Sequence, residues 1–208
     1  MNTSTRSIAL VLSAVAFFAL PLKGQLLVGG QFGLNLGTVH VDPEPSSEEY
    51  SMLLGFAIGG VVNTPLAGGL EFQAQPMVTR KGTKIKESGD EVQFKVTYLD
   101  LPLLLVYKFT DEGEIQPYAL AGPSVSLLLA AKVEVPGGGE FDIKDETETL
   151  DLGIGLGAGV RIPQDDLVFF ADLRYVLGLL NLNAEEGEAT VKNRGLLLSA
   201  GLMVPLSK

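Results

Sequence analysis

The sequence comprises 208 residues, a length that suits a single β domain. It is 46% hydrophobic and contains 25 glycines but no cysteine, which excludes the disulfides that stabilise many secreted proteins. The formal net charge of −10 argues against a nucleic-acid partner, because binding to phosphates requires a basic surface.

Residues 1–24 are predicted to be a secretory signal peptide. Arg6 precedes the apolar run IALVLSAVAFFALPL (8–22), and the small residue Gly24 follows it, an order typical of such peptides. The run is short for a membrane-spanning helix, and a hydrophobic first strand is the alternative. We therefore expect the mature protein to be one β-barrel domain over residues 25–208.

Beyond residue 25, apolar residues recur at every second position, which is the period of a β-strand. Most of the predicted strands exceed the about nine to eleven tilted residues that cross a bilayer. The eight predicted strands cover about residues 26–39, 51–63, 68–80, 93–109, 115–132, 149–162, 167–181 and 193–206.

The predicted connections alternate strictly between short and long. Short turns are expected at 63–67, 110–114 and 163–166, and longer polar segments at 40–50, 81–92, 133–148 and 182–192. Bacterial outer-membrane barrels arrange their short periplasmic turns and long external loops in this way. The sequence thus predicts an all-β fold, an eight-stranded antiparallel up-and-down transmembrane β-barrel, located in the outer membrane.

The segment DLGIGLGAGVRIP (151–163) indicates which strand face points inward. Glycines occupy every second position from Gly153 to Gly159, and apolar side chains stand between them. A ring of eight strands encloses a space only just wide enough for side chains. We therefore expect the glycines inside, where they leave room for large side chains from opposite walls, and the aliphatic side chains outside in lipid. A soluble barrel with an apolar interior is the alternative.

The polar phase of the strands is then predicted to line the interior as a structural network. Four of the charged candidates are acidic and three are basic, and such near balance matters because an unpaired buried charge is costly. A proton or ion path is the alternative, and the orientation of strand 115–132 stays open. The predicted interior residues are Gln31, Asn35, Glu71, Gln73, Gln75, Asp100, Lys108, Asp151, Arg161, Asp172 and Arg174.

Aromatic and charged residues near the strand ends suggest surface contacts. Tyr107, Phe109, Tyr118 and Tyr175 are candidates for a belt at the membrane interface. The loops 40–50 and 133–148 are acidic, whereas 81–92 carries Lys81, Lys84 and Lys86. Contact with lipopolysaccharide phosphates, directly or through a divalent cation, is one interpretation of these loops, and a solvated surface is the preferred one.

Catalytic chemistry has little support in the sequence. His40 is the single histidine, and Ser46, Ser47 and Ser51 follow it in a segment with two prolines, whereas a nucleophile and its base need a fixed geometry. No phosphate-binding loop, cluster of metal ligands or dinucleotide fingerprint is present. We therefore expect no catalytic residues, metal or cofactor, and a lipid-modifying enzyme that uses His40 is the alternative.

Five segments carry a resemblance to a known family. They are YLDLPLLLVYKF (98–109), IQPYALAGPSVSLLL (115–129), DLGIGLGAGVRI (151–162), FFADLRYVLGLLNLN (169–183) and KNRGLLLSAGLMVPL (192–206). The chain resembles the PorT-type outer-membrane β-barrel family common in Bacteroidota, from about residue 25 to its end. The resemblance implies an integral barrel, and some family members take part in protein secretion. The C-terminal GLMVPLSK lacks the terminal aromatic residue that such barrels often present to their insertion machinery.

These observations lead to one principal functional hypothesis and one alternative from another class. We expect a non-enzymatic barrel with a structural or interaction role through its external loops, accessory to protein secretion if it follows the resemblance. Its expected partners are outer-membrane lipids, lipopolysaccharide and the barrel-insertion machinery. The alternative is a barrel that binds or transports a small or lipidic ligand, with Leu104, Val106, Leu128 and Met203 as an apolar lining.

Overall fold

The computed structural model describes residues 25–42, 49–87, 90–182 and 190–206. The predicted signal peptide, residues 1–24, and the predicted loop segments 43–48 and 183–189 lie outside the described residues. Within the described ranges, the structure contains no helix that is long and apolar enough to span a membrane.

The described chain consists almost wholly of β-strands. They are β1 (Leu27–Asp42), β2 (Glu49–Ala67), β3 (Leu70–Ala74), β4 (Met77–Glu87), β5 (Asp90–Lys108), β6 (Gln116–Val135), β7 (Gly139–Asp142), β8 (Leu150–Gln164), β9 (Leu167–Gly178) and β10 (Thr190–Pro205), with the short 3-10 helix η2 (Lys144–Glu146) before β8.

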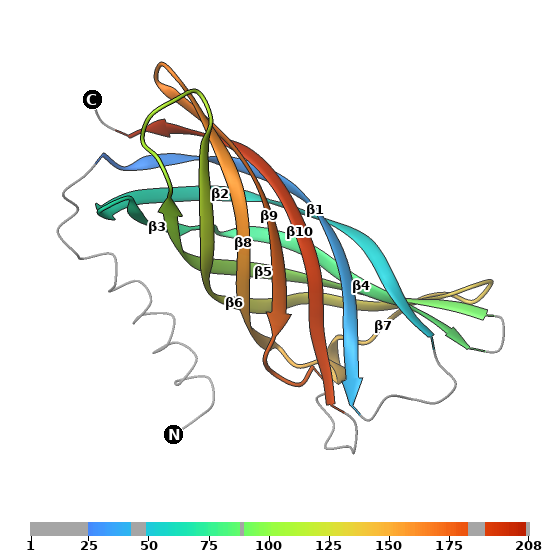
Figure 1. Ribbon diagram of the computed structural model, residues 1–208. Coiled ribbons are helices and arrows are strands. Elements are labelled where there is room, and N and C mark those ends of the chain that lie inside the picture. The colour runs from blue at the N-terminus through green and yellow to red at the C-terminus, as the bar shows by residue number, and fades with distance from the viewer. Residues whose placement is uncertain (1–24, 43–48, 88–89, 183–189, 207–208) are drawn as a thin grey trace.

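The strands form a closed antiparallel ring (Figure 1). β1 pairs with β2 on one side and with β10 on the other, from Leu27 opposite Pro205 to Asp42 opposite Thr190. β3 and β4 together occupy one place between β2 and β5, and β7 is a short addition to β6. The prediction of an all-β antiparallel sheet is confirmed, and the ring has eight strand positions.

The structure has ten strands among the described residues and not eight, because the predicted strand 68–80 is divided into β3 and β4 and because β7 is an additional strand. Gln75 and Pro76 separate β3 from β4, and proline lacks the N–H group that a strand ladder requires. The interruption is nevertheless hydrogen-bonded, since the Pro76 carbonyl accepts from Gly60 N at 2.9 Å. The inward face continues across it, with Gln73, Gln75 and Met77 all buried. The tenth strand, β7, lies in the predicted loop 133–148.

Short connections gather at one end of the ring, which we call the short-turn end. The turn predicted at 63–67 is wrong, since β2 runs to Ala67 and the turn consists of Gly68 and Gly69, with φ of 60° and 79°. Positive φ at both turn residues is what a two-residue hairpin turn of type I′ requires, and glycine adopts it freely. The connections near 110–114 and 163–166 lie where the sequence predicts them.

The opposite end, which we call the long-loop end, differs more from the prediction. Segment 81–92 is not a loop, because β4 continues to Glu87 and β5 begins at Asp90. In Figure 1 the β4–β5 and β6–β7 hairpins project to the right, past the ends of β1 and β10. Strand pairing thus extends past the ring into these hairpins.

The outer surface of the ring is apolar and its interior is polar. Leu156 is 65% exposed and Leu54 is 62% exposed. Comparable exposed side chains are Phe32, Leu34, Ile58, Leu99, Leu105, Ile154, Leu173, Leu198 and Leu202. The Leu-rich phase therefore points outward as predicted, and the alternative of an apolar interior in a soluble barrel is wrong.

The glycines of β8 face inward and make room for large side chains, as predicted. A Cβ atom at Gly159 would lie 2.5 Å from Cζ of Tyr118, and one at Gly155 would lie 3.0 Å from Cδ of Arg174. These side chains come from the neighbouring strands β6 and β9, whereas the sequence predicted opposite walls. The inward glycines of β8 therefore leave room for large side chains of the two strands beside it.

The orientation of strand 115–132, left open by the sequence, changes along β6. Tyr118, Leu120, Ser124, Ser126 and Leu128 are buried, so even-numbered residues point inward over most of the strand. A β-bulge then shifts the register between Thr97 and Tyr98 of β5. Beyond it the odd-numbered Ala131 is buried, because an extra residue in one strand reverses the alternation.

Candidate functional site

The structure places the predicted interior residues inside the ring. Ten of them are at most 6% exposed. The remaining one, Lys108, has a side chain that is 18% exposed and contacts buried Glu71. The ten are Gln31, Asn35, Glu71, Gln73, Gln75, Asp100, Asp151, Arg161, Asp172 and Arg174.

One group of these residues surrounds Glu71 near the short-turn end. Arg161 forms an ion pair with the Glu71 carboxylate, and Lys108 lies 3.2 Å from its other oxygen. Asn63 donates to Glu71 at 2.9 Å, and Arg161 also donates to the Gln73 amide oxygen at 3.1 Å. One carboxylate thus holds together side chains from four strands, β2, β3, β5 and β8.

A second group surrounds Asp172 on β9. Its carboxylate accepts hydrogen bonds from Ser199 at 2.9 Å, from Arg174 at 3.1 Å and from the Tyr118 hydroxyl at 3.1 Å. The Arg161 guanidinium lies 5.2 Å from the centre of the Tyr118 ring, so Tyr118 connects this group with the first.

Tyr118 therefore corrects one prediction. It is 1% exposed and lies inside the ring, whereas the sequence placed it in an aromatic belt. It belongs to the inward phase of β6, and Gly159 on β8 leaves space for its ring. Tyr107 and Phe109 are 48% and 62% exposed on the outside near the short-turn end, whereas Tyr175, which is 42% exposed, stands opposite Leu156 near the middle of β8 and not near its end.

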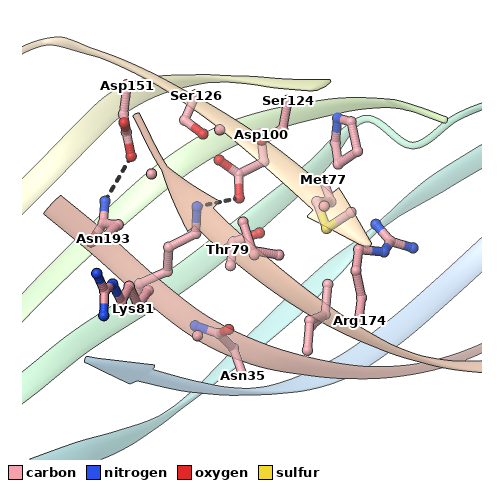
Figure 2. A pocket seen from close by; sticks show the side chains of 18 of the residues that line it. Asn35, Met77, Thr79, Lys81, Asp100, Ser124, Ser126, Asp151, Arg174 and Asn193 are labelled. Atoms are coloured by element: carbon pink, nitrogen blue, oxygen red, sulfur yellow. Dashed lines mark hydrogen bonds and ion pairs between the residues drawn. The ribbon is translucent and has the colours of Figure 1, made fainter. Parts of the chain in front are cut away.

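A third group lies nearer the long-loop end and contains Lys81 (Figure 2). The Lys81 ammonium group lies 3.0 Å from Asp100 and 5.0 Å from the centre of the Tyr98 ring. Asn193 donates to Asp151 at 2.8 Å. Lys81 was predicted to lie in a basic loop, but it stands on β4 and points inward. The described interior therefore holds four acidic and four basic side chains.

A cavity of about 40 Å³ lies between these groups, and Figure 2 shows its lining. Asp100, Asp151, Thr79 and Arg174 line it, and each has a buried polar atom without a protein partner among the described residues. The size and polarity of the cavity suit a few ordered waters, which commonly complete such networks. The interior is thus a packed polar network around a small cavity.

Sequence reasoning missed several members of this network, namely Asn63, Lys81, Tyr98, Asn193 and Ser199. The two-residue period could have identified some of them. Tyr98 stands two residues before Asp100, and Lys81 stands two residues after the buried Thr79. Because segment 81–92 was predicted to be a loop, Lys81 was not predicted to lie on the inner face of a strand.

A larger cavity of about 330 Å³ lies at the long-loop end. Val39, Val41, Ile85, Phe94 and Val191 are among its lining residues. The apolar residues predicted to line a ligand site do not line this cavity. Leu104 and Val106 pack against Tyr118 and Leu120, Met203 packs against Val61 and Phe170, and Leu128 packs against Tyr98 and Ala131.

The charged side chains of the projecting hairpins pair mainly with one another. Lys84 lies 2.9 Å from Glu91, and Lys132 pairs with Glu140. The hydrogen bonds from these lysines hold the pKa of Glu91 and that of Glu140 below the ordinary value of 4.5. This pairing fits the solvated surface preferred above.

The candidate catalytic histidine shows no catalytic geometry in the part of the chain that the structure describes. His40 stands opposite Lys192 of β10, and no hydrogen bond joins it to Ser51 on β2. Ser46 and Ser47 lie outside the described residues. Within the described ranges, no group of histidine, aspartate and glutamate is arranged to hold a metal ion.

Comparison with known proteins gives one family and several similar structures. The sequence profile of the outer membrane protein beta-barrel domain family matches residues 17–183. The outer membrane protein OprG from Pseudomonas aeruginosa is similar with a TM-score of 0.55 and 10% identity, over 89% of this chain and 97% of OprG. Neisserial surface protein A gives a TM-score of 0.49 and 18% identity, over 87% of this chain and 97% of its own. No curated protein matches the sequence.

Proposed function

Because the chain belongs to the outer membrane protein beta-barrel domain family, we propose that it is an eight-stranded up-and-down transmembrane barrel that acts through its long-loop end. The family and the apolar outer surface agree that it is an integral protein of the outer membrane. We take the long-loop end to be external. Its role in this proposal is structural or in protein interaction, and it involves neither catalysis nor conduction.

The observation that carries this proposal is the balanced network inside the ring. Four acidic and four basic side chains occupy the interior, and Glu71, Asp172 and Asp100 each pair with a basic side chain. The cavity between the groups measures about 40 Å³. An ion in transit would have to break these pairs, and leaving a buried charge without its partner costs about 3–5 kcal/mol.

A secretion-accessory role is the finer form of this proposal, and it is supported by the PorT-type resemblance, which extends from about residue 25 to the end of the sequence. That resemblance also supports an origin in Bacteroidota, and the order of Arg6, the apolar run 8–22 and Gly24 supports removal of residues 1–24 as a signal peptide. The proposed partners are outer-membrane lipids, lipopolysaccharide and the barrel-insertion machinery. The projecting β4–β5 and β6–β7 hairpins offer a protein partner an accessible surface (Figure 1).

Two measurements test the proposal. The purified protein in a planar lipid bilayer is expected to show no discrete channels, and steady conductance steps from protein that shifts its gel mobility on heating would overturn the sealed interior. Deletion of the gene in its own bacterium is expected to lower the amount of specific secreted proteins in the culture medium. An unchanged set of secreted proteins would overturn the accessory role and leave the barrel with a structural one.

Ligand binding is a second candidate function, and the cavity of about 330 Å³ at the long-loop end favours it. Pockets for small molecules commonly measure about 300–1,000 Å³ and are mostly apolar. The packed network beneath the cavity supports binding and argues against transport through the ring.

A further inference from the structure

The cavity at the long-loop end is a pocket with a closed floor. Tyr98, Leu128 and Ala131 are buried together, and Val96 and Ile143, which line the pocket, pack against them. Asn193 lines both this pocket and the smaller polar cavity. The floor of the pocket is therefore mostly apolar, and Asn193 is the lining residue that it shares with the smaller cavity.

Hydrogen bonds hold one wall of the pocket in place. The Ile143 amide donates to Ala131 at 3.0 Å, and the Leu182 amide donates to Val191 at 2.8 Å. A third bond, from the Glu148 amide to the Leu182 carbonyl at 2.9 Å, ties these two segments together. A preformed wall lowers the entropy that binding must offset, so the pocket is ready to receive a ligand.

The chemistry of the lining indicates what that ligand is. Aliphatic and aromatic side chains dominate, and Glu146 contributes the one carboxylate among the described lining residues. No lysine, arginine or histidine is among those lining residues. Two lysines of β4 form ion pairs, Lys84 with Glu91 and Lys81 with Asp100. An anionic head group would lose its hydration beside Glu146 without gaining a cation.

We propose that this pocket binds a single uncharged, mostly hydrocarbon molecule, of which a medium-chain alcohol is the simplest example. Its polar end lies toward Glu146 and Thr147, and its hydrocarbon lies against Val39, Ile85 and Phe94. This inference rests on the ligand-binding function proposed above and specifies its ligand class.

The isoleucines of the chain provide an experiment with an internal control. Ile85 and Ile143 line the pocket, whereas Ile58 and Ile154 are 56% and 48% exposed on the outer surface. The protein, with labelled isoleucine methyl groups and in lipid nanodiscs, is titrated with 1-octanol and, separately, with octanoate. The two probes share a chain length and differ in head-group charge.

We expect 1-octanol to shift the Ile85 and Ile143 methyl signals saturably, while Ile58 and Ile154 follow the linear change caused by partition into lipid. Octanoate is expected to bind at least about tenfold more weakly, because its carboxylate has no partner in the pocket. The variants Val39→Phe and Val191→Phe fill the pocket from β1 and β10 and should each abolish the saturable shift. Val160→Phe on the outer surface should leave it unchanged.

Different outcomes would contradict the proposed class of ligand and the proposal that the pocket binds a ligand at all. Tighter binding of octanoate than of 1-octanol would overturn the uncharged class while leaving a functional pocket. Linear shifts of equal size at all four isoleucines with both probes would overturn ligand binding altogether. A saturable shift that persists in both filled variants, each shown to be folded by its heat-dependent gel mobility, would place the ligand elsewhere and also overturn the proposal.

Discussion

The ammonium group of Lys81 lies 3.0 Å from a carboxylate oxygen of Asp100, with both side chains inside the ring of strands. This pair connects β4 with β5 at a point where the two strands continue beyond the ring into a hairpin. It also adds a fourth basic side chain to an interior that holds four acidic ones. The stability of the barrel should therefore depend on Lys81.

Replacing Lys81 with methionine should destabilise the barrel by about 3–5 kcal/mol, because Asp100 would then be a buried charge without a partner. The double variant Lys81→Met/Asp100→Asn should recover most of this loss, since removing both partners leaves no uncompensated charge. The measurement is urea unfolding in lipid vesicles, followed by the heat-dependent shift in gel mobility.

The matched control for this prediction is Lys84→Met on the same strand. Lys84 pairs with Glu91, and both side chains are about one-third exposed, so its loss should cost less than about 1 kcal/mol. Equal destabilisation by the Lys81 and Lys84 variants would contradict a structural role for the interior pair.

A second prediction concerns the glycines of β8, which differ in what surrounds them. A Cβ at Gly159 would lie 2.4 Å from the Ala171 carbonyl oxygen, a backbone atom, whereas one at Gly155 would meet the flexible Arg174 side chain at 3.0 Å. Gly159→Ala should therefore lower the free energy of unfolding by about 1–3 kcal/mol, and Gly155→Ala should lower it by less. The same unfolding assay measures both variants. A larger loss of stability for Gly155→Ala than for Gly159→Ala would contradict the close approach of the Ala171 carbonyl to Gly159.

The ring was predictable because one physical pattern, alternation with period two, extends along nearly every strand. Asp172 and Arg174 on β9, and Glu71 and Gln73 on β3, stand two residues apart among outward apolar side chains. The spacing alone places each pair on the inner face. The same spacing does not show that Asp172 receives a hydrogen bond from Tyr118, 54 residues away.

The rest could not be predicted where this pattern changes or where composition misleads. The bulge opposite Thr97 and Tyr98 reverses the alternation of β6, and a period-based analysis has no signal for it. Lys81 lies in a segment rich in lysine and glycine that resembles a loop, although it is paired strand. The pocket at the long-loop end is formed by residues from Val39 to Asn193, so no local motif could indicate it.

A third prediction tests the outer surface. Leu156, near the middle of β8, is 65% exposed on that surface. Arginine on the lipid face near the bilayer midplane costs about 2–4 kcal/mol, so Leu156→Arg should lower the free energy of unfolding in vesicles by that amount. Glu112→Arg, in an exposed turn at the short-turn end, should change it by less than about 0.5 kcal/mol. A tolerated Leu156→Arg would indicate that this face does not contact lipid.

The last prediction is a pH dependence of the β6–β7 hairpin. A hydrogen bond from Lys132 is the main reason that the pKa of Glu140 lies below its ordinary value of 4.5. A carboxylate with a lowered pKa in the folded state contributes stability above its ordinary pKa, and that contribution is lost as the pH falls through the lowered value. The protection factor of the Gly138 amide, whose N–H is bonded to Val135 at 3.0 Å, should therefore fall over that acidic range in a hydrogen-exchange measurement. Lys132→Met should move the pKa of Glu140 back toward 4.5 in a carboxyl-carbon NMR titration, while the pKa of Glu91, which depends on Lys84, stays low. If Glu140 titrated at or above 4.5 in the unmodified protein, the Lys132 pair would not form in the membrane-bound barrel.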